Sequence, residues 1–195
     1  MTTWLLLPVL RHWRCRRPDV HLELSEFTSA DAMVGSLEEG RTDVAFGPRP
    51  SRTDAQITVF GTEEVVVVAA PTHPFAELSG VPFSALEGEP FVHYNPDNGM
   101  ASWVDELAAR HQVALNPVLR TRSPRTAAQL AAAGMGVTIV PVSALPSRPA
   151  GTVRRLGPAV ERDVVAIVAA PSDTLVHQFV ADIHRRGLPA WAGPT

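Results

Sequence analysis

The sequence contains no lysine, a single cysteine and no long apolar run, and the last two features each exclude a class of protein. Because Cys15 is the only cysteine, neither an internal disulfide nor a multi-cysteine metal cluster can form within the chain. No apolar run approaches the ~20 residues that a membrane-spanning helix needs. The start of the chain lacks a basic segment followed by an apolar stretch and a small-residue cleavage site, which argues against export. We therefore expect a cytoplasmic protein without a membrane segment.

Charge and length further limit the possible partners and domain organisation of the chain. All 17 basic residues are arginine, which we attribute to genomic composition bias, and the 20 acidic residues give a net charge of −3. Phosphate contacts need a concentrated basic surface, so we do not expect this chain itself to bind nucleic acid. A length of 195 residues with 45% hydrophobic content suffices for one large domain or two small lobes with a substantial core.

The residue types that carry metal or catalytic chemistry do not form the required patterns. The seven histidines include no His-x-x-x-His or His-Glu-x-x-His pair, and no acidic cluster joins them. There is no Gly-x-Ser-x-Gly elbow and no Walker loop. The adjacent acids Glu38–Glu39 and Glu63–Glu64 point in different directions and are interpreted as solvated. The sequence predicts no metal, no cofactor and no catalytic constellation.

Apolar spacing predicts helices and strands that alternate along the chain, which is typical of α/β folds. We expect helices at residues 3–17, 30–39, 100–111, 124–133 and 172–186, and strands at 20–25, 44–46, 57–60, 63–70, 90–94, 115–121, 137–140, 152–156 and 164–169. The runs 65–70 and 164–169 are almost entirely apolar and indicate two crossings between two lobes. Residues 1–70 with 165–190 are assigned to lobe I, and 71–164 to lobe II.

The stretch from Ser123 to Pro146 combines a helix, a glycine turn and a strand. Ser123 is suited to cap the helix, and Gly134 to end it in the left-handed conformation. The turn brings bare backbone N–H groups to a surface, where they can hold an anion or a polar ligand. We expect Gly136 to approach a ligand closely, so that a β-carbon there obstructs binding more than folding.

This stretch resembles the Ala-Ala-Gly-x-Gly-Ile-x-x-x-Pro signature in the effector-binding domain of LysR-type transcriptional regulators. Three more segments match that family in the same order. Residues 5–20 resemble its first helix and the Tyr-Pro-x-Val start of its next strand, 37–45 its Leu-x-x-Gly-x-Leu-Asp-x-Ala turn, and 68–74 its Val-x-Pro-x-His-Pro crossover. The resemblance implies an α/β fold of the type 2 periplasmic-binding-protein kind, with two Rossmann-like lobes joined by two crossover strands.

The sequence departs from the family pattern at its start. Family members begin this domain with a Leu-x-Ile-Gly strand, and they carry a winged-helix DNA-binding domain upstream of it. Met1 falls where that strand should just have ended. We therefore expect the first strand of lobe I to be missing, and contact with DNA only through an upstream domain that is absent from this sequence.

Candidate effector-binding residues lie where helices begin, because ligands of open α/β sheets bind outside the carboxyl ends of strands. Plain capping, worth ~1 kcal/mol each, is the alternative for the hydroxyl groups. Arg49 is the natural counter-charge for an anion, and its alternative is a solvated loop arginine. The polar loop 94–99 can equally be an ordinary turn. The resemblance favours effector contacts, and the candidates are Thr2, Thr3, Thr28, Ser29, Gly47, Arg49, Asn95, Asn98, Ser123, Met135 and Gly136.

The resemblance implies an effector-sensing domain that binds a small anionic metabolite between its lobes. It also implies a homodimer, with a higher oligomer in the full-length regulator, and pairing of the first helix with the partner's helix 124–133. A free-standing solute-binding protein is one alternative and would need an export signal or lipid anchor. An enzyme on the same fold is another, and would need clustered titratable groups.

Overall fold

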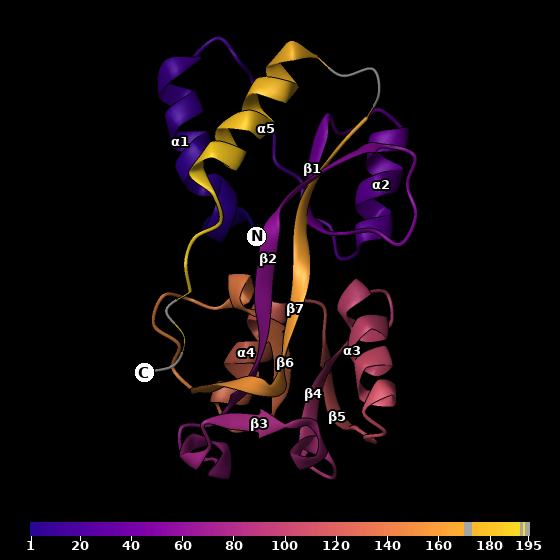
Figure 1. Ribbon diagram of the computed structural model, residues 1–195, viewed down its shortest axis with the longest axis vertical. Helices are drawn as coiled ribbons and strands as arrows, with labels where there is room; N and C mark the ends of the chain where they lie inside the picture. The colour runs from indigo at the N-terminus through magenta and orange to yellow at the C-terminus, as the bar shows by residue number, and fades with distance from the viewer. Residues whose placement is uncertain (170–172, 192, 194–195) are drawn as a thin grey trace. The chain divides into compact units, whose positions relative to one another are not determined.

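The computed structural model describes residues 1–169, 173–191 and 193, and its elements are drawn in Figure 1. The chain divides into two compact units. Unit 1 comprises residues 1–62 and 163–190, and unit 2 comprises 63–162 together with the chain from 191 onward. The two strands that pass from one unit into the other are β2 (Gln56–Ala69) and β7 (Thr152–Val168). The boundaries at 62/63 and 162/163 therefore fall within strands.

Two helices pack side by side in unit 1. A single π-helical turn, η1 (Thr2–Leu6), leads into α1 (Leu7–Arg16), and α5 (Thr174–Arg186) lies along it (Figure 1). The Trp13 indole N–H donates to Asp182 Oδ2 at 2.7 Å, and its ring meets Phe179 edge-on at 5.0 Å. Leu5 and Val9 are buried in the same apolar cluster. Hydrophobic contact and a partly buried hydrogen bond thus help to join these helices.

The strands of unit 1 are covered by α2 (Ala30–Glu38). β1 (Val44–Pro48) pairs antiparallel with β7, from Val44 opposite Val168 to Pro48 opposite Val164. Met33, Val34 and Leu37 of α2 are buried at the predicted helical spacing and pack against the sheet. The predicted cap is confirmed, since Ser29 Oγ accepts from the Ala32 N–H at 3.1 Å.

The strand expected at residues 20–25 is wrong. This segment is irregular, and Leu22 and Leu24 are exposed. A strand needs a hydrogen-bonding neighbour. Among the described residues, no backbone hydrogen bond joins 20–25 to a strand, and no strand pairs with the outer edge of β1. The segment has the alternation of apolar and polar residues that a strand shows, but among the described residues it lacks the backbone pairing that would make it one.

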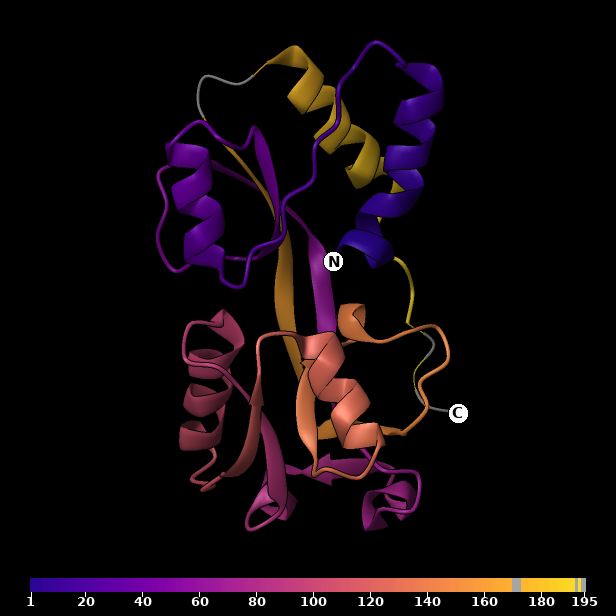
Figure 2. The same cartoon turned by 180° about the vertical axis from the view of Figure 1, so that it is seen from behind.

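Unit 2 is built on parallel strands. β4 (Pro90–Tyr94) pairs in parallel with β5 (Asn116–Thr121), and β3 (Gly80–Pro82) pairs in parallel with β7. β6 (Thr138–Pro141) pairs antiparallel with β2 and meets β4 through the Phe91–Val137 bridge. The helices α3 (Gly99–Arg110) and α4 (Pro124–Ala132) flank these strands (Figure 2). Short 3-10 turns complete the unit at Pro74–Glu77, Phe83–Leu86 and Val142–Ala144.

Two pairs of predicted strands are each one continuous strand. Residues 57–60 and 63–70 belong to β2, and 152–156 and 164–169 belong to β7. Gly61 lies inside β2 at φ +142°, a conformation that glycine tolerates, so the strand continues through this residue. The last helix begins at Thr174 with Asp173 as its cap, while the predicted start at Ser172 lies outside the described residues.

Candidate functional site

In unit 1 the end of β1 lies against the beginning of α2. Gly47 sits so close to Met33 that a β-carbon would come within 3.0 Å of its sulfur. Met33 belongs to the first turn of α2, directly after the Ser29 cap. The N-terminus of a helix carries a partial positive charge, which favours anions. Three predicted residues, Ser29, Gly47 and Arg49, therefore lie in one region of unit 1.

Arg49 has a partner that the sequence interpretation did not include. Its Nε donates to Asp163 Oδ2 at 2.7 Å, and the two side chains are 49% and 36% exposed. The register of β1 and β7 brings them together, since Pro48 lies opposite Val164. Only knowledge of that strand pairing could have revealed Asp163 from the sequence. Arg49 is thus an exposed cation with a carboxylate partner.

In unit 2 the parallel strands β4 and β5 bring two helix N-termini together. The Asn95 N–H donates to Thr121 O at 3.0 Å, which joins the two strand ends. Ser123 Oγ accepts from the Thr126 N–H at 3.4 Å and caps α4, as predicted. Asn98 caps α3 by accepting from the Met100 N–H at 2.8 Å. These groups meet at the carboxyl edge of the sheet, where α/β folds bind ligands.

Asn98 also joins the two helix starts directly. Its Nδ2 donates to Arg122 O at 2.5 Å, immediately before the Ser123 cap. Asn98 is buried, and both ends of its amide are already bonded within the protein. Its role is therefore to fix the loop, and Asn95 and Ser123 remain the more accessible candidates in this region.

A buried ion pair lies close to the start of α3. Arg162 Nε and Nη2 lie 2.9 and 2.8 Å from Glu63 Oε1, and Glu63 Oε2 accepts from the Ser143 N–H at 3.1 Å. Arg162 Nη1 lies 3.2 Å from the Met100 sulfur, a weak acceptor. The interpretation of Glu63 as a solvated acid is wrong. Its partners come from segments 80 and 99 residues away, so no local pattern announces them.

Tyr94 is buried beside this pair. Its hydroxyl donates to Ile139 O at 2.7 Å. Burial raises the pKa of the Tyr94 hydroxyl far above its ordinary value, while Thr138 and Arg162 act in the opposite direction. The phenol therefore stays protonated and serves as a fixed hydrogen-bond donor inside unit 2.

The glycine turn after α4 lies elsewhere. Gly134 has φ +86°, the left-handed stop that was expected. Gly136, at φ +132°, rests against the backbone of Pro90, and the Val137 N–H donates to Pro90 O at 2.7 Å. Pro90 begins β4, whereas Asn95 follows its end. The close approach of Gly136 is thus to protein backbone, and the exposed Met135 lies at the opposite end of β4 from Ser123.

The threonine candidates receive less support. Thr2 and Thr3 lie within η1 rather than before a helix, and α1 has no side-chain cap. Thr28 precedes the Ser29 cap and is exposed.

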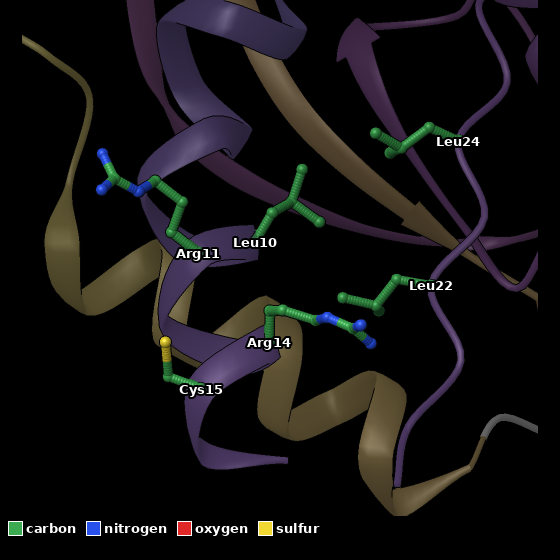
Figure 3. A pocket seen from close by; sticks show the side chains of 6 residues that line it. All are labelled: Leu10, Arg11, Arg14, Cys15, Leu22 and Leu24. Carbon is green, nitrogen blue, oxygen red and sulfur yellow. The ribbon is translucent and has the colours of Figure 1, made fainter. Parts of the chain in front are cut away.

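An open surface hollow of about 440 Å³ lies on unit 1, apart from these candidates (Figure 3). It separates α1 from the irregular segment 20–25, and Cys15 on its rim is exposed. The lining residues are Leu10, Arg11, Arg14, Cys15, Leu22 and Leu24. No group of His, Cys, Asp or Glu within the described ranges could hold a metal ion. None of the helices in those ranges is long and apolar enough to cross a membrane.

Parallel strands, flanking helices and polar groups at the strand ends define an α/β ligand-binding domain. The chain belongs to the LysR substrate binding domain family, which matches residues 1–186. This confirms the resemblance that the sequence motifs carry.

Curated relatives of this chain regulate transcription. The chain is 33% identical over 149 residues to a probable cat1 operon transcriptional activator of Acinetobacter lwoffii, which covers 73% of this chain and 48% of that protein. It spans about half the length of the curated relatives it matches. The relatives are regulators and not enzymes, in agreement with the lack of a catalytic pattern in the sequence.

Solved structures share the fold. The regulatory domain of Synechocystis PCC6803 CcmR in complex with 2-PG superposes with a TM-score of 0.85, at 20% identity, over 95% of this chain and 92% of that one. The BenM effector-binding domain with its effector benzoate gives 0.78, at 23% identity, over 93% and 85%. At this level of identity the likeness establishes the fold alone, which is that of LysR effector-binding domains.

Proposed function

We propose that this chain is the effector-sensing part of a LysR-type regulator and binds a small anionic metabolite. The metabolite would control transcription through a DNA-binding module outside this sequence. Such control requires that the ligand bind one conformation more tightly than another. Membership of the family supports the sensing role, and the charges at the strand ends support the sign of the ligand.

The observation that carries the proposal is the meeting of the α3 and α4 N-termini at the carboxyl edge of β4 and β5. The hydrogen bond from Asn98 to Arg122 holds the two starts together. Backbone N–H groups at such positions bind carboxylates and phosphates without further adaptation. Unit 1 offers a matching set, in which Arg49 lies near the start of α2. We assign ligand contacts to Ser29, Gly47, Arg49, Asn95 and Ser123.

The bound ligands of two structural neighbours suit this chemistry. BenM has benzoate as its effector, and the CcmR domain was solved with 2-PG. Benzoate is a carboxylate, the group that an arginine fork and helix N-termini recognise. We therefore place the effector of this chain among small carboxylates or phosphates.

A thermal-shift panel of small anions, each beside a neutral analogue such as benzamide for benzoate, tests the proposal. A ligand at 100 times its Kd stabilises the folded state by about 2.7 kcal/mol, which corresponds to roughly 5–10 °C in a chain of this size. The anion should raise the melting temperature and its neutral analogue should not. Equal shifts for both, or none across the panel, would contradict an anion site.

Arg49→Ala is the first variant to examine. Loss of a charged hydrogen bond should weaken anion binding by about 1.5–3 kcal/mol, or roughly 10- to 150-fold. Stability should change little, because the Arg49–Asp163 pair is exposed. Arg41→Ala is the matched control, since Arg41 is also paired and exposed and follows the other end of α2. Equal affinities of the two variants in titration calorimetry would remove Arg49 from the site.

A further inference from the structure

Each unit already supplies a carboxylate to its own arginine. Arg49 pairs with Asp163 in unit 1, and Arg162 pairs with Glu63 in unit 2. Arg162 and Asp163 are consecutive residues of β7 and carry opposite charges. Successive side chains of a strand point to opposite faces, so the two neighbours serve different ion pairs.

The two ion pairs differ in how freely they can rearrange. The Glu63 side chain is 0% exposed and that of Arg162 is 14% exposed. Breaking such a pair leaves a charge buried without a partner, so a rearrangement of the Glu63–Arg162 pair is strongly unfavourable. The Arg49–Asp163 pair is open to water, and exposed pairs contribute little to stability. The arginine of the unit 2 pair is therefore fixed, whereas the arginine of the unit 1 pair can adjust to an incoming anion.

The contact between Arg49 and Asp163 uses only one edge of the guanidinium. Asp163 Oδ2 accepts from Nε at 2.7 Å. Among the residues that the structure describes, none forms a hydrogen bond with Nη1 or Nη2 of Arg49. Guanidinium groups bind carboxylates and phosphates through two parallel N–H donors. The terminal nitrogens thus remain available for a ligand while Nε is held.

We propose that Asp163 is a positioning residue for anion recognition by Arg49. It fixes the guanidinium through Nε, so that the terminal nitrogens are presented to the ligand in one orientation. Its negative charge also repels the anion and keeps the affinity moderate, so that binding stays reversible. This inference rests on the proposed function, because it assumes that Arg49 contacts the effector.

Two substitutions separate the orienting effect from the charge effect. In Asp163→Asn the amide oxygen still accepts from Nε, but the negative charge is gone. In Asp163→Ala both are lost, and the arginine side chain regains rotamer freedom that binding must remove again. A single charge about 4–6 Å from the anion changes its affinity by about 3- to 30-fold at an effective dielectric constant of about 40–80, as suits a pair that is open to water.

The experiment measures the affinity of benzoate and of inorganic phosphate by titration calorimetry. We expect Asp163→Asn to bind the probe about 3- to 30-fold more tightly than the parent chain. We expect Asp163→Ala to bind it at least about threefold more weakly than Asp163→Asn, given the rotamer freedom it regains. The control is Glu39→Gln, which removes the same charge from another exposed ion pair, that with Arg41. It should leave the affinity within about twofold of the parent, because it lies at the far end of α2.

Three outcomes overturn the inference. If Asp163→Asn matches Glu39→Gln, the charge of Asp163 does not act on the ligand. If Asp163→Asn and Asp163→Ala bind equally, Asp163 does not orient Arg49. If Asp163→Asn and Asp163→Ala change the affinity by the same factors in an Arg49→Ala background as in the parent chain, Asp163 does not act through Arg49. Failure of the proposed function has its own signature, which is unchanged binding in Arg49→Ala alone.

Discussion

Glu63 keeps its carboxylate wholly inside unit 2, where Arg162 and the Ser143 N–H bind both of its oxygens. Glu63→Ala should destabilise the protein by about 3–5 kcal/mol, because it leaves the Arg162 charge largely buried without its partner. Denaturant unfolding would measure this loss. The control is Glu106→Ala, whose partner Arg110 lies in an exposed i,i+4 pair, and here the loss should stay below about 1 kcal/mol. Similar losses of stability in the two variants would contradict a stabilising role of the buried Glu63–Arg162 pair.

Glu64, the next residue, predicts a pH dependence of stability. Burial raises the pKa of its carboxyl above the ordinary value; Arg155 lowers it and Glu161 raises it further. Glu64 Oε1 lies 3.1 Å from Arg155 Nε but is not aligned for a hydrogen bond. A raised folded-state pKa favours folding below the ordinary pKa of the carboxyl, and this contribution is lost as the pH rises through the folded-state value.

Glu64→Gln removes that dependence. We expect the melting temperature of the variant to exceed that of the parent chain at pH 7, and the difference to shrink as the pH falls below 5. Thermal unfolding followed from pH 4 to 7 would measure both. A parent chain that grows more stable between pH 5 and 7 relative to Glu64→Gln would show that Arg155 outweighs burial.

The turn between α4 and β6 carries a prediction at the scale of elements. A β-carbon on Gly136 would overlap the carbonyl of Pro90, and φ is +132° there. Gly134, at φ +86°, has no atom nearer than 3.9 Å to such a carbon. Gly134→Val should therefore cost on the order of 1–2 kcal/mol from the left-handed conformation alone. Gly136→Val should cost more, because backbone must move.

Thermal melting of the two valine variants tests this ranking. This ranking reverses the expectation from the sequence, in which Gly136→Val would mainly abolish binding in a protein that still folds. A Gly136→Val protein that melts like the parent chain but no longer binds anions would restore that expectation.

The sequence predicts an element well when the element makes its contacts locally. The caps Ser29 and Ser123 and the burial of Met33, Val34 and Leu37 follow from residues a few positions apart. The segment 20–25 has the alternation of a strand but no partner strand in the described part of the chain, which only the assembled sheet can reveal. The ion pairs of Glu63 and Arg49 join residues 99 and 114 positions apart, so no spacing in the sequence predicts them.

Assembly is the prediction that belongs to the whole molecule. The resemblance to LysR regulators predicts a two-fold homodimer in which α1 meets α4 of a second copy. Leu5, Val9 and Trp13 of this helical region are buried within unit 1, so they offer no apolar surface for such a contact. Leu7 remains exposed on α1.

Light scattering at tens of micromolar protein tests the dimer. We expect twice the chain mass, and a shift toward the monomer in Leu7→Glu. Val118→Glu is the control, since Val118 is also an exposed apolar residue but lies on β5. A monomeric parent chain, or loss of the dimer in the control as well, would contradict an interface through α1.

The single exposed cysteine on α1 makes the chain convenient for spectroscopy. Cys15 is the only thiol in the sequence, so a maleimide dye or nitroxide attaches at one place without any prior substitution. Met135→Cys would add a second exposed attachment point, on unit 2. Energy transfer or pulsed electron resonance between the two labels would then report, in solution, whether an anion changes the separation of the two units.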